Sequence, residues 1–430
     1  MQTRFTPAQL ADPDTAVSEA MIRKCVHCGF CTATCPTYVL LGDELDSPRG
    51  RIYLIKEMLE ADADPTPEVV KHIDRCLSCL ACTTTCPSGV DYAKLIDHAR
   101  DYVEQRYQRP FVDRAWRALL AWLLPHRGRF AAALRLAPLA KPFAPLLARA
   151  PALKPVAAML ALAPRRRPAL WRARPAHDHP NGRVILLQGC AEPVLAPQVR
   201  AATIRLLNRM GYEAVFVRGE GCCGGLTLHM GKAEAARDAA RRNIAAWSTE
   251  IAKGDIAAIL TTASGCGVML EDYGHLFRDD PALAGPAKQV SDLAQDIAEF
   301  VDRIGLPPIV DHRPLNVAYH AACTLQHGQK ITAAPRRLLA AAGFEVRDIP
   351  EGHLCCGSAG TYNILQSEIA SRLLERKLEN IDRTGADLIA AGNIGCLTQI
   401  ASGSKRPIVH TIELLDWATG GPAPEGLGDL

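Results

Sequence analysis

Hydrophobic positions in the second half of the chain alternate between short apolar runs and longer amphipathic runs. Apolar runs at 184–187 and 317–319 are each followed by a stretch with the apolar spacing of a helix, at 198–210 and 335–342. A glycine ends each helix, and a further apolar run follows it. This alternation predicts strands and helices in turn, which is typical of a parallel α/β sheet.

The same order occurs twice. The segments "MGYEAVFV" and "AGFEVRDI" predict second strands, helices are expected over 233–247 and 367–380, and third strands over 256–261 and 388–391. A fixed order of elements at matched spacing indicates an internal duplication. We therefore expect two α/β modules, covering residues 181–312 and 313–430.

Cysteines occur at equivalent places in both copies. The first copy contains Cys190, the adjacent pair Cys222 and Cys223, and Cys266; the second contains Cys323, the pair Cys355 and Cys356, and Cys396. In both copies 32 positions separate the first cysteine from the pair. Because the carboxyl ends of parallel strands meet at one edge of a sheet, we expect each set of four to converge.

Three interpretations of the Cys-Cys-Gly sets remain open. Four soft thiolates suit an iron–sulfur cluster or zinc. A disulfide between adjacent cysteines would be strained and easily reduced, which suits a redox switch. Buried free cysteines pack like small apolar residues, but packing alone does not explain the duplicated spacing. We favour a metal or cluster site, with His320, His327 and His353 as candidates to support the second set or to face a substrate.

The first 109 residues contain eight cysteines in two runs, "CVHCGFCTATCP" and "CLSCLACTTTCP". This spacing is typical of two [4Fe–4S] clusters, in which the cysteine before proline reaches the other cluster. Zinc usually takes two separated pairs of ligands and fits these tight runs poorly. The predicted ligands are Cys25, Cys28, Cys31 and Cys86 for the first cluster, and Cys76, Cys79, Cys82 and Cys35 for the second. We expect residues 1–109 to form a mainly helical, ferredoxin-like domain with two clusters.

The segment between the two runs predicts a helix that starts at Ser47 and Pro48. Arg49 and Arg51 lie at its start. Their positive charge could raise the reduction potential of a nearby cluster. The alternative is that they make surface contacts or bind a partner subunit.

Residues 110–180 contain no cysteine and form a basic connector. Thirteen Lys or Arg and one acid, Asp113, occur in 111–175, and prolines divide the segment, so we expect short amphipathic helices and no membrane-spanning one. These helices either lie on an anionic membrane or acidic partner, or pack on this protein and leave their arginines in water.

Composition narrows the functional classes. The amino-terminal segment has no apolar core of a secretion signal, so sixteen cysteines in 430 residues indicate metal or redox chemistry in a reducing cytoplasm. The net charge of +3 gives no reason to expect a nucleic-acid partner. No G-x-G-x-x-G follows a predicted strand, so we expect substrate oxidation on partner chains.

The tandem runs followed by two Cys-Cys-Gly modules resemble the glycolate oxidase iron–sulfur subunit family. The resemblance covers nearly the whole chain, least well the connector, and rests on "CVHCGFCTATCPTYVLLGDELDSPRGRIYLIKEMLE", "TASGCG", "CTLQH" and "HLCCGSAGTYNIL". The combination of modules is also similar to iron–sulfur subunits of anaerobic glycerol-3-phosphate dehydrogenase and to relatives of heterodisulfide reductase.

The resemblance implies a non-flavin subunit of a membrane-associated glycolate dehydrogenase. Flavoprotein partners that carry FAD would oxidise glycolate to glyoxylate, and this chain would relay the electrons toward a quinone or other acceptor, with no catalytic residue of its own. It would lie peripherally on the cytoplasmic face of the inner membrane. The alternatives are a subunit of an anaerobic glycerol-3-phosphate or D-lactate dehydrogenase, and a heterodisulfide-reductase-like enzyme acting at the Cys-Cys-Gly sites.

One departure concerns the Cys-Cys-Gly sets. In heterodisulfide reductase relatives such modules hold non-cubane [4Fe–4S] clusters and use a fifth cysteine in a C-x-x-C ending. Here Cys266 is followed by Met269, and Cys396 by Gln399. A conventional cluster, a zinc ion or a vacant thiol site stays open for each module. The expected fold is α+β overall, with the ferredoxin-like domain preceding the duplicated α/β unit.

Overall fold

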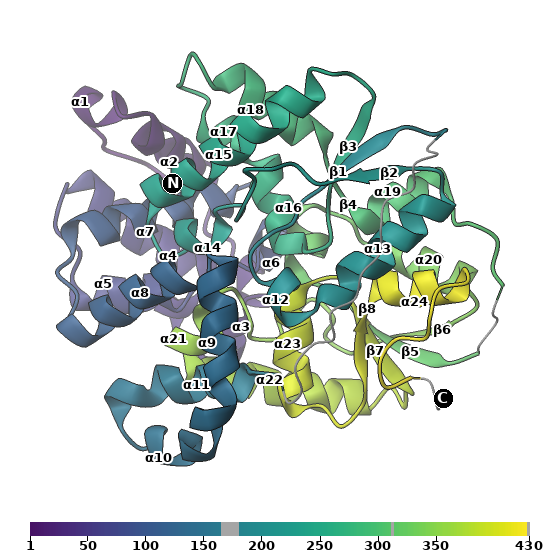
Figure 1. Ribbon diagram of the computed structural model, residues 1–430. Helices are drawn as coiled ribbons and strands as arrows, with labels where there is room; N and C mark the ends of the chain where they lie inside the picture. Colours follow the sequence, from purple (N-terminus) through teal and green to yellow (C-terminus); the bar gives the residue numbers. More distant parts are fainter. Residues whose placement is uncertain (165–179, 311–313, 428–430) are drawn as a thin grey trace.

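The computed structural model describes residues 1–164, 180–310 and 314–427. Along the chain, a helical amino-terminal part is followed by a helical connector and then by two α/β modules (Figure 1). This order confirms the α+β fold expected from the sequence, with a duplicated parallel-sheet unit after the ferredoxin-like part.

The amino-terminal part is built from short helices around a small apolar core. Helices α2, α4, α5 and α7 pack on one another, and their core includes Ile22, Ile55 and Leu95. Ser47 caps α4 by accepting a hydrogen bond from the Gly50 N–H, as the sequence predicts. The elements are α1 (Pro7–Leu10), α2 (Pro13–Lys24), η1 (Phe30–Thr32), α3 (Pro36–Leu41), η2 (Glu44–Asp46), α4 (Pro48–Glu60), α5 (Pro67–Asp74), α6 (Ala81–Thr85) and α7 (Tyr92–Arg106).

The connector is helical, and its predicted end at 165–180 lies almost wholly outside the described residues. Its elements are α8 (Phe111–Leu123), α9 (Arg127–Ala140), η3 (Lys141–Phe143), α10 (Ala144–Leu147), η4 (Pro151–Leu153) and α11 (Lys154–Leu162). Helix α8 packs through Leu120, and α11 through Met159, on a cluster that includes residues of both modules.

Prolines interrupt this connector less than the sequence suggested. Pro138 lies inside α9, while Pro142 and Pro145 fall in the first turns of η3 and α10, where a missing N–H is tolerated. Arg127–Leu147 is therefore one helical run, long and apolar enough to cross a membrane by length and composition alone. None of its most apolar window is buried inside the protein.

The first module is a parallel sheet with strand order β2-β1-β3-β4. The strands are β1 (Arg183–Leu186), β2 (Glu213–Val215), β3 (Ile256–Thr261) and β4 (Ala294–Asp296). The helices are α12 (Glu192–Leu195), α13 (Pro197–Arg209), α14 (Gly225–Leu228), α15 (Ala233–Ile251), α16 (Ser264–Glu271), α17 (Tyr273–Leu276), α18 (Ala284–Leu293) and α19 (Ile297–Ile304). The first three strands match the sequence prediction, and β4 is an addition.

The second module repeats this plan with strand order β6-β5-β7-β8. The strands are β5 (Asn316–His320), β6 (Glu345–Asp348), β7 (Leu388–Ala391) and β8 (Ile408–His410). The helical elements are the π-helical turn η5 (Thr324–Gly328), α20 (Ala334–Ala341), α21 (Tyr362–Leu365), α22 (Ser367–Asp382), α23 (Ile394–Gly403) and α24 (Thr411–Ala418).

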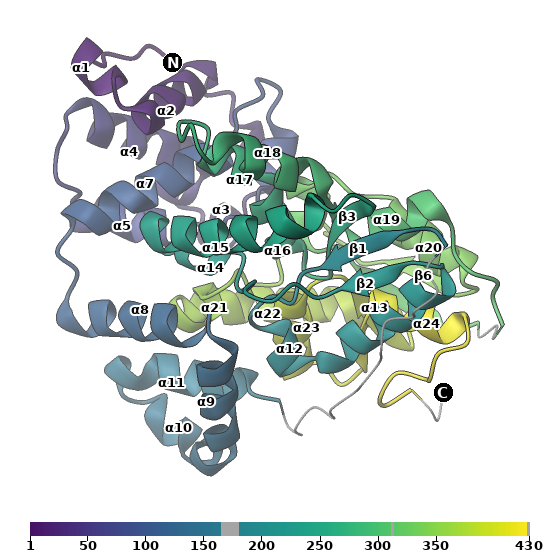
Figure 2. The same cartoon turned by 45° about the horizontal axis from the view of Figure 1, so that its top comes forward.

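The two modules share one hydrophobic core. Helix α13 of the first module packs on α24 of the second, and α19 of the first packs on α20 of the second (Figures 1 and 2). Side chains from both sheets and from these four helices form this core, among them Leu207, Phe300, Leu339 and Leu415. The two halves therefore face each other in a pseudo-symmetric pair.

Candidate metal centres

The two amino-terminal cysteine runs adopt the same backbone. His27 (φ 56°) and Gly29 (φ 85°) in the first run correspond to Ser78 (φ 50°) and Leu80 (φ 62°) in the second. A left-handed conformation costs a residue other than glycine about 1–2 kcal/mol. The turn directs backbone N–H groups at sulfur, since the Ser78 nitrogen lies 3.5 Å from Sγ of Cys76. The retention of this strained turn in both runs fits loops that wrap a cluster.

The first predicted set lies near the surface. Cys25, Cys28, Cys31 and Cys86 line one hollow together with Arg49, and Cys28 is exposed. Burial raises the pKa of Cys31 to about 11. The four soft thiols are thus gathered at one place, which fits an iron–sulfur cluster, although their assignment as ligands remains a prediction.

The second predicted set is buried. Cys35, Cys76, Cys79 and Cys82 all lie inside the protein. Burial, and then the neighbouring thiols of Cys79, Cys76 and Cys35, raise the pKa of Cys82 well above its ordinary value. Four buried thiols this close together fit a site that a positively charged metal centre would stabilise as thiolates.

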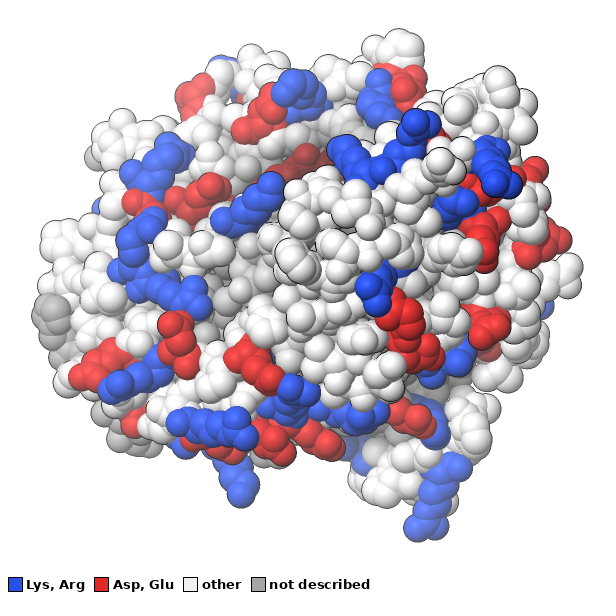
Figure 3. All heavy atoms as spheres, turned by 180° about the vertical axis from the view of Figure 1, so that it is seen from behind, with Lys and Arg blue, Asp and Glu red and all other residues white. Residues whose placement is uncertain are grey.

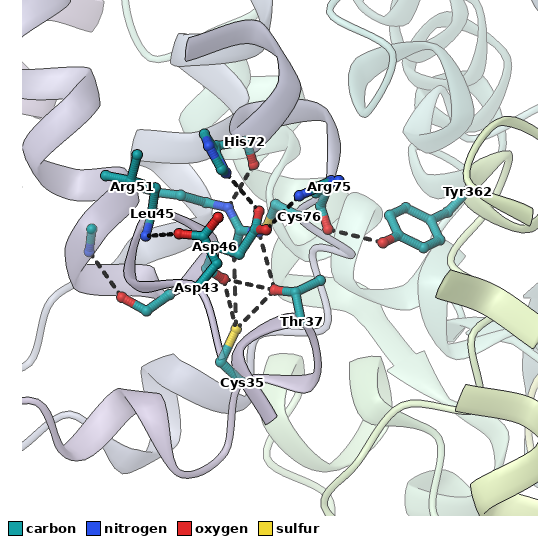
Figure 4. Close-up of polar contacts among 12 residues, drawn as sticks. Cys35, Thr37, Asp43, Leu45, Asp46, Arg51, His72, Arg75, Cys76 and Tyr362 are labelled. Carbon is teal, nitrogen blue, oxygen red and sulfur yellow. Dashed lines mark hydrogen bonds and ion pairs between the residues drawn. The ribbon is translucent and has the colours of Figure 1, made fainter. Parts of the chain in front are cut away.

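A buried charge network lies against the second set (Figure 4). The Asp46 carboxylate accepts hydrogen bonds from Arg51 (3.2 Å) and Arg75 (2.7 Å), and lies 2.9 Å from Nδ1 of His72. Arg51 is fully buried, and its Nη1 lies 3.9 Å from Sγ of Cys35. Of the two arginines that the sequence singled out, Arg51 therefore adjoins the second set, and Arg49 the first.

The second set also contacts the second module. The Tyr362 hydroxyl donates a hydrogen bond of 3.0 Å to the carbonyl oxygen of Arg75, next to Cys76 (Figure 4). Cys79 and Cys355 belong to one buried cluster that joins the two parts of the chain. Burial, and then the thiol of Cys323, raise the pKa of Cys79 well above its ordinary value.

The first Cys-Cys-Gly set converges at the carboxyl ends of its strands. The Cys222 thiol is hydrogen-bonded to those of Cys190 and Cys223, which lowers the pKa of Cys222 well below its ordinary value. Cys223 is in turn hydrogen-bonded to Cys266. Gly224 (φ 97°) makes the turn, and a Cβ there would lie 2.9 Å from the carbonyl oxygen of Ala236.

The second Cys-Cys-Gly set converges in the same way. Sγ of Cys323 lies 3.9 Å from Sγ of Cys355, and Cys356 is hydrogen-bonded to both Cys355 and Cys396. Gly357 (φ 92°) makes the equivalent turn. Both quartets predicted from the sequence are thus brought together, and four soft thiols at one place fit a cluster or a zinc ion.

The three histidines of the second module have different surroundings. His327 places Nδ1 2.7 Å from Oγ1 of Thr84 and Nε2 3.4 Å from the carbonyl oxygen of His353. His320 lies beside Cys356 and Cys396. Burial, and then the charge of Lys377, lower the pKa of His320 to about 3, so its imidazole is neutral.

Sequence reasoning missed some polar residues at these sites. Lys377 is buried, and its Nζ donates a hydrogen bond of 3.3 Å to the carbonyl oxygen of Glu351. It follows Ile369 and Leu373 at intervals of four, so its helical phase places it on the buried face of α22. Asp46 and Tyr362 carry no such local signal, because their roles depend on contacts distant in sequence.

Comparisons with known proteins match this architecture. A family model described as a 4Fe-4S dicluster domain matches residues 21–90, and one described as a cysteine-rich domain matches 184–271 and 317–401. The glycolate oxidase iron-sulfur subunit of Escherichia coli is 41% identical over 97% of this chain and 99% of its own length. The probable glycolate oxidase iron-sulfur subunit of Bacillus subtilis is 31% identical over 94% of this chain and 95% of its own length.

One further relative matches about half of the chain, and one solved structure shares only its fold. Lactate utilization protein A of Bacillus cereus is 29% identical over 54% of this chain and 98% of its own length. The crystal structure of a hypothetical protein from Helicobacter pylori shares the fold, with a TM-score of 0.57 at 10% identity over 96% of this chain and 73% of that one. Residues 21–90 are a domain for two [4Fe–4S] clusters. The chain belongs to the glycolate oxidase iron–sulfur subunit family.

Proposed function

We propose that this chain is the electron-transferring subunit of a glycolate-oxidising complex, with substrate oxidation on partner chains. The substrate is inferred from the names of the two full-length relatives. The observation that carries the proposal is the contact of the buried amino-terminal set with the second module, through Cys79, Cys323 and Cys355. Thiol sites thus follow one another from the surface to the interior.

The proposed ligands are those that the sequence suggests. Cys25, Cys28, Cys31 and Cys86 would hold the first cluster, and Cys76, Cys79, Cys82 and Cys35 the second. Within the domains proposed at 1–109, 110–180, 181–312 and 313–430, the two modules would hold further centres at their quartets.

Iron–sulfur clusters supply single-electron chemistry when bound at such thiols. Oxidation of glycolate to glyoxylate releases two electrons and two protons, so two successive single-electron transfers through this chain would serve each substrate molecule. The acceptor, a quinone or another oxidant, would take both electrons. The protein's own residues keep water from the inner set and offset negative charge, as Arg51 does beside Cys35.

We place the flavoprotein contact at the surface set. Val26 and Phe30 flank the exposed Cys28 and are themselves 67% and 63% exposed. Large apolar side chains that remain exposed around a redox site are typical of a protein-docking surface. A partner subunit that carries FAD would deliver electrons there.

The relay is tested in the complex co-purified with its flavoprotein partners. Cys76→Ser should abolish glycolate-dependent quinone reduction, because it removes a proposed ligand of the buried cluster. Oxidation of glycolate with a dye that accepts electrons directly from flavin should persist. Thr84→Ser, in the same cysteine run, is the matched control and should keep both activities. Quinone reduction that survives Cys76→Ser would contradict the relay.

We also propose that the connector touches the membrane surface. Leu136, Leu139, Phe143 and Leu146 are exposed on the run Arg127–Leu147, with Leu139 at 74%. Residues 114–164 contain no acid. From behind, this region is the lower-right lobe of the molecule, where white and blue atoms predominate (Figure 3). Apolar side chains together with Lys and Arg suit an anionic bilayer surface.

Vesicle co-sedimentation of the purified chain tests this contact. Binding to phosphatidylglycerol vesicles should exceed binding to phosphatidylcholine vesicles and weaken with salt. Leu139→Asp with Leu146→Asp should reduce it at least about tenfold, because each change removes a buried-apolar contribution. Leu10→Asp, on the distant α1, should have no effect. If the double variant bound vesicles as well as the wild-type chain, the membrane contact would be contradicted, and a protein partner would be favoured for this surface.

A further inference from the structure

His320 has a buried imidazole that is unsatisfied within the described part of the chain. It ends β5 and is 2% exposed, and neither ring nitrogen has a partner among the residues that the structure describes. Leaving a buried polar group unsatisfied costs about 1–3 kcal/mol. A buried polar group of this kind is retained where a water, ion or metal supplies the missing partner.

The position of this imidazole points to a metal. One ring nitrogen of His320 and the Sγ atoms of Cys356 and Cys396 all lie within 4.8 Å of one another. Two ligands of one tetrahedral iron or zinc are about 3.5–3.8 Å apart, given bonds of about 2.0–2.3 Å. A small contraction would therefore bring all three to one metal ion.

The first module lacks this group. Leu187 stands three positions before Cys190, as His320 stands three positions before Cys323. Leu187 is buried directly after the equivalent strand β1, so the first module has no imidazole at this position. The duplicated fold thus accommodates leucine or histidine at this place, and only histidine can bind a metal.

Two other polar side chains near the second quartet are already engaged. His327 contacts Thr84 and the carbonyl oxygen of His353. Lys377 donates to the carbonyl oxygen of Glu351, and its charge acts on Cys356, Cys355 and Cys396. A cation beside the thiols lowers the cost of gathering several thiolates in a buried site.

We propose that His320 is a nitrogen ligand to iron in the second module, beside Cys356 and Cys396. The second module then holds a mixed nitrogen–sulfur iron centre, whereas the first has leucine at the equivalent position. A neutral imidazole in place of an anionic thiolate raises the reduction potential of an iron–sulfur centre. The second centre therefore favours accepting electrons from the buried amino-terminal cluster. This inference rests on the proposed function, because it takes the metal of the second module to be redox-active iron.

Pulsed EPR on the full chain, purified anaerobically with ¹⁵N-labelled histidine and reduced, tests the proposal. We expect a strong coupling from a directly bound histidine nitrogen in the wild-type chain. His320→Leu should abolish it, and the first module shows that leucine fits this position. His353→Leu, on the same side of the module, is the control and should keep it. His320→Cys should retain iron, lose the coupling and shift the midpoint potential downward.

The outcomes separate this proposal from the relay. Absence of the histidine coupling, or its survival in His320→Leu, would overturn the ligand assignment while the two amino-terminal clusters keep their signals. A total of about eight irons per chain, with none in the second module, would overturn it too. Absence of the amino-terminal cluster signals would instead contradict the proposed function itself.

Discussion

The two Cys-Cys-Gly modules share a frame but differ around their thiols. Both place four cysteines at the carboxyl ends of a parallel sheet, and both turn at a left-handed glycine. The second quartet lies against the amino-terminal cluster domain through Cys79 and Cys355. The first instead faces the connector, where Arg127 donates a hydrogen bond of 2.7 Å to the carbonyl oxygen of Gly189, next to Cys190.

The duplication thus preserved the backbone of the module and changed its environment. The glycine turns and strand ends are the same in each copy because they fix where the thiols converge. Around the second quartet, His320 stands where the first module has the apolar Leu187. Lys377 stands where the first module has the neutral Asn243. Because the backbone turns are equivalent, substitutions at the turn glycines should act alike in both modules. Because the side chains around the two quartets differ, substitutions at those side chains should act in one module only.

The largest effects are expected at the glycine turns, where the modules should behave alike. A Cβ on Gly357 would lie 2.6 Å from the carbonyl oxygen of Ala370, and one on Gly224 2.9 Å from that of Ala236. Gly357→Ala should cost about 2–5 kcal/mol of unfolding free energy, from left-handed strain and from overpacking. It should also remove metal from the second site. Urea unfolding and metal analysis measure both, and Gly352→Ala, where φ is not left-handed, is the control.

Gly224→Ala should do the same to the first module, with a somewhat smaller cost because its contact is longer. If only one of the two glycine variants lost its metal, the two frames would not be equivalent.

The two sets of ion pairs between the modules should differ in how much stability is lost when the acidic residue is removed. Asp416 of α24 binds Arg205 and Arg209 of α13, and its own side chain is 1% exposed. The pseudo-symmetric Asp302 of α19 binds Arg337 of α20, and that pair is much more exposed. Asp416→Ala should cost about 3 kcal/mol of unfolding free energy, because it leaves two partly buried arginines without this carboxylate. Asp302→Ala should cost less than about 1 kcal/mol.

Urea unfolding of the two single variants measures these costs. Equal costs would mean that burial does not distinguish the two sides of the shared core.

Lys377 offers a test confined to the second quartet. It follows Ala370 by seven positions, as Asn243 follows Ala236 in the first module. Lys377→Asn should weaken metal binding at the second site about 10- to 100-fold, the usual effect of losing a group that supports metal ligands. Chelator competition measures this loss, and the first site, which already has asparagine, should keep its affinity. Equal weakening at both sites would point to a general loss of stability.

The smallest expected effect concerns pH and the residues that cap α19 and α24. Burial raises the pKa of Asp296 from 3.8 to about 7 and lowers that of His410 from 6.5 to about 4. Folded Asp296 keeps a proton that the unfolded chain releases, so stability falls as pH rises from about 4 to 7. Folded His410 stays neutral, so stability falls as pH drops from about 6.5 to 4.

Asp296→Asn keeps the cap but removes its titration. Between pH 5.5 and 8 the wild-type chain should lose about 1–2 kcal/mol of unfolding free energy that this variant does not lose. Unfolding midpoints at both pH values measure the difference. Parallel pH profiles of variant and wild type would show that the buried carboxyl does not titrate in this range.

The duplicated strands could be predicted because their signal is local. Apolar runs ending at cysteines located β1, β3, β5 and β7, and the glycine stops located the helices. The strands β4 and β8 were missed because each has only three residues and leads directly into a helix. Their identity depends on pairing with β3 and β7, which no local pattern encodes.

The candidate sites were predictable in membership but not in arrangement. Cysteine spacing suggested the four sets, because ligand spacing follows from cluster geometry, and their role as ligands stays a prediction. That Cys79 meets the second module rather than the first depends on how the domains dock. That His320 has no partner in the described ranges likewise follows from burial by distant segments, whereas the sequence indicates only that a histidine is near.

The packing of α24 on α13 also has a consequence for biosynthesis. Arg205 and Asp416 are separated by 211 positions, so the first module cannot complete its core until α24, near the carboxyl end, has been made. At about 5–20 residues per second, translation of that stretch takes about 10–40 s. The amino-terminal cysteine runs emerge before this interval begins. The order of synthesis therefore gives cluster insertion a period in which the first cysteine sets are available while the shared core is still open.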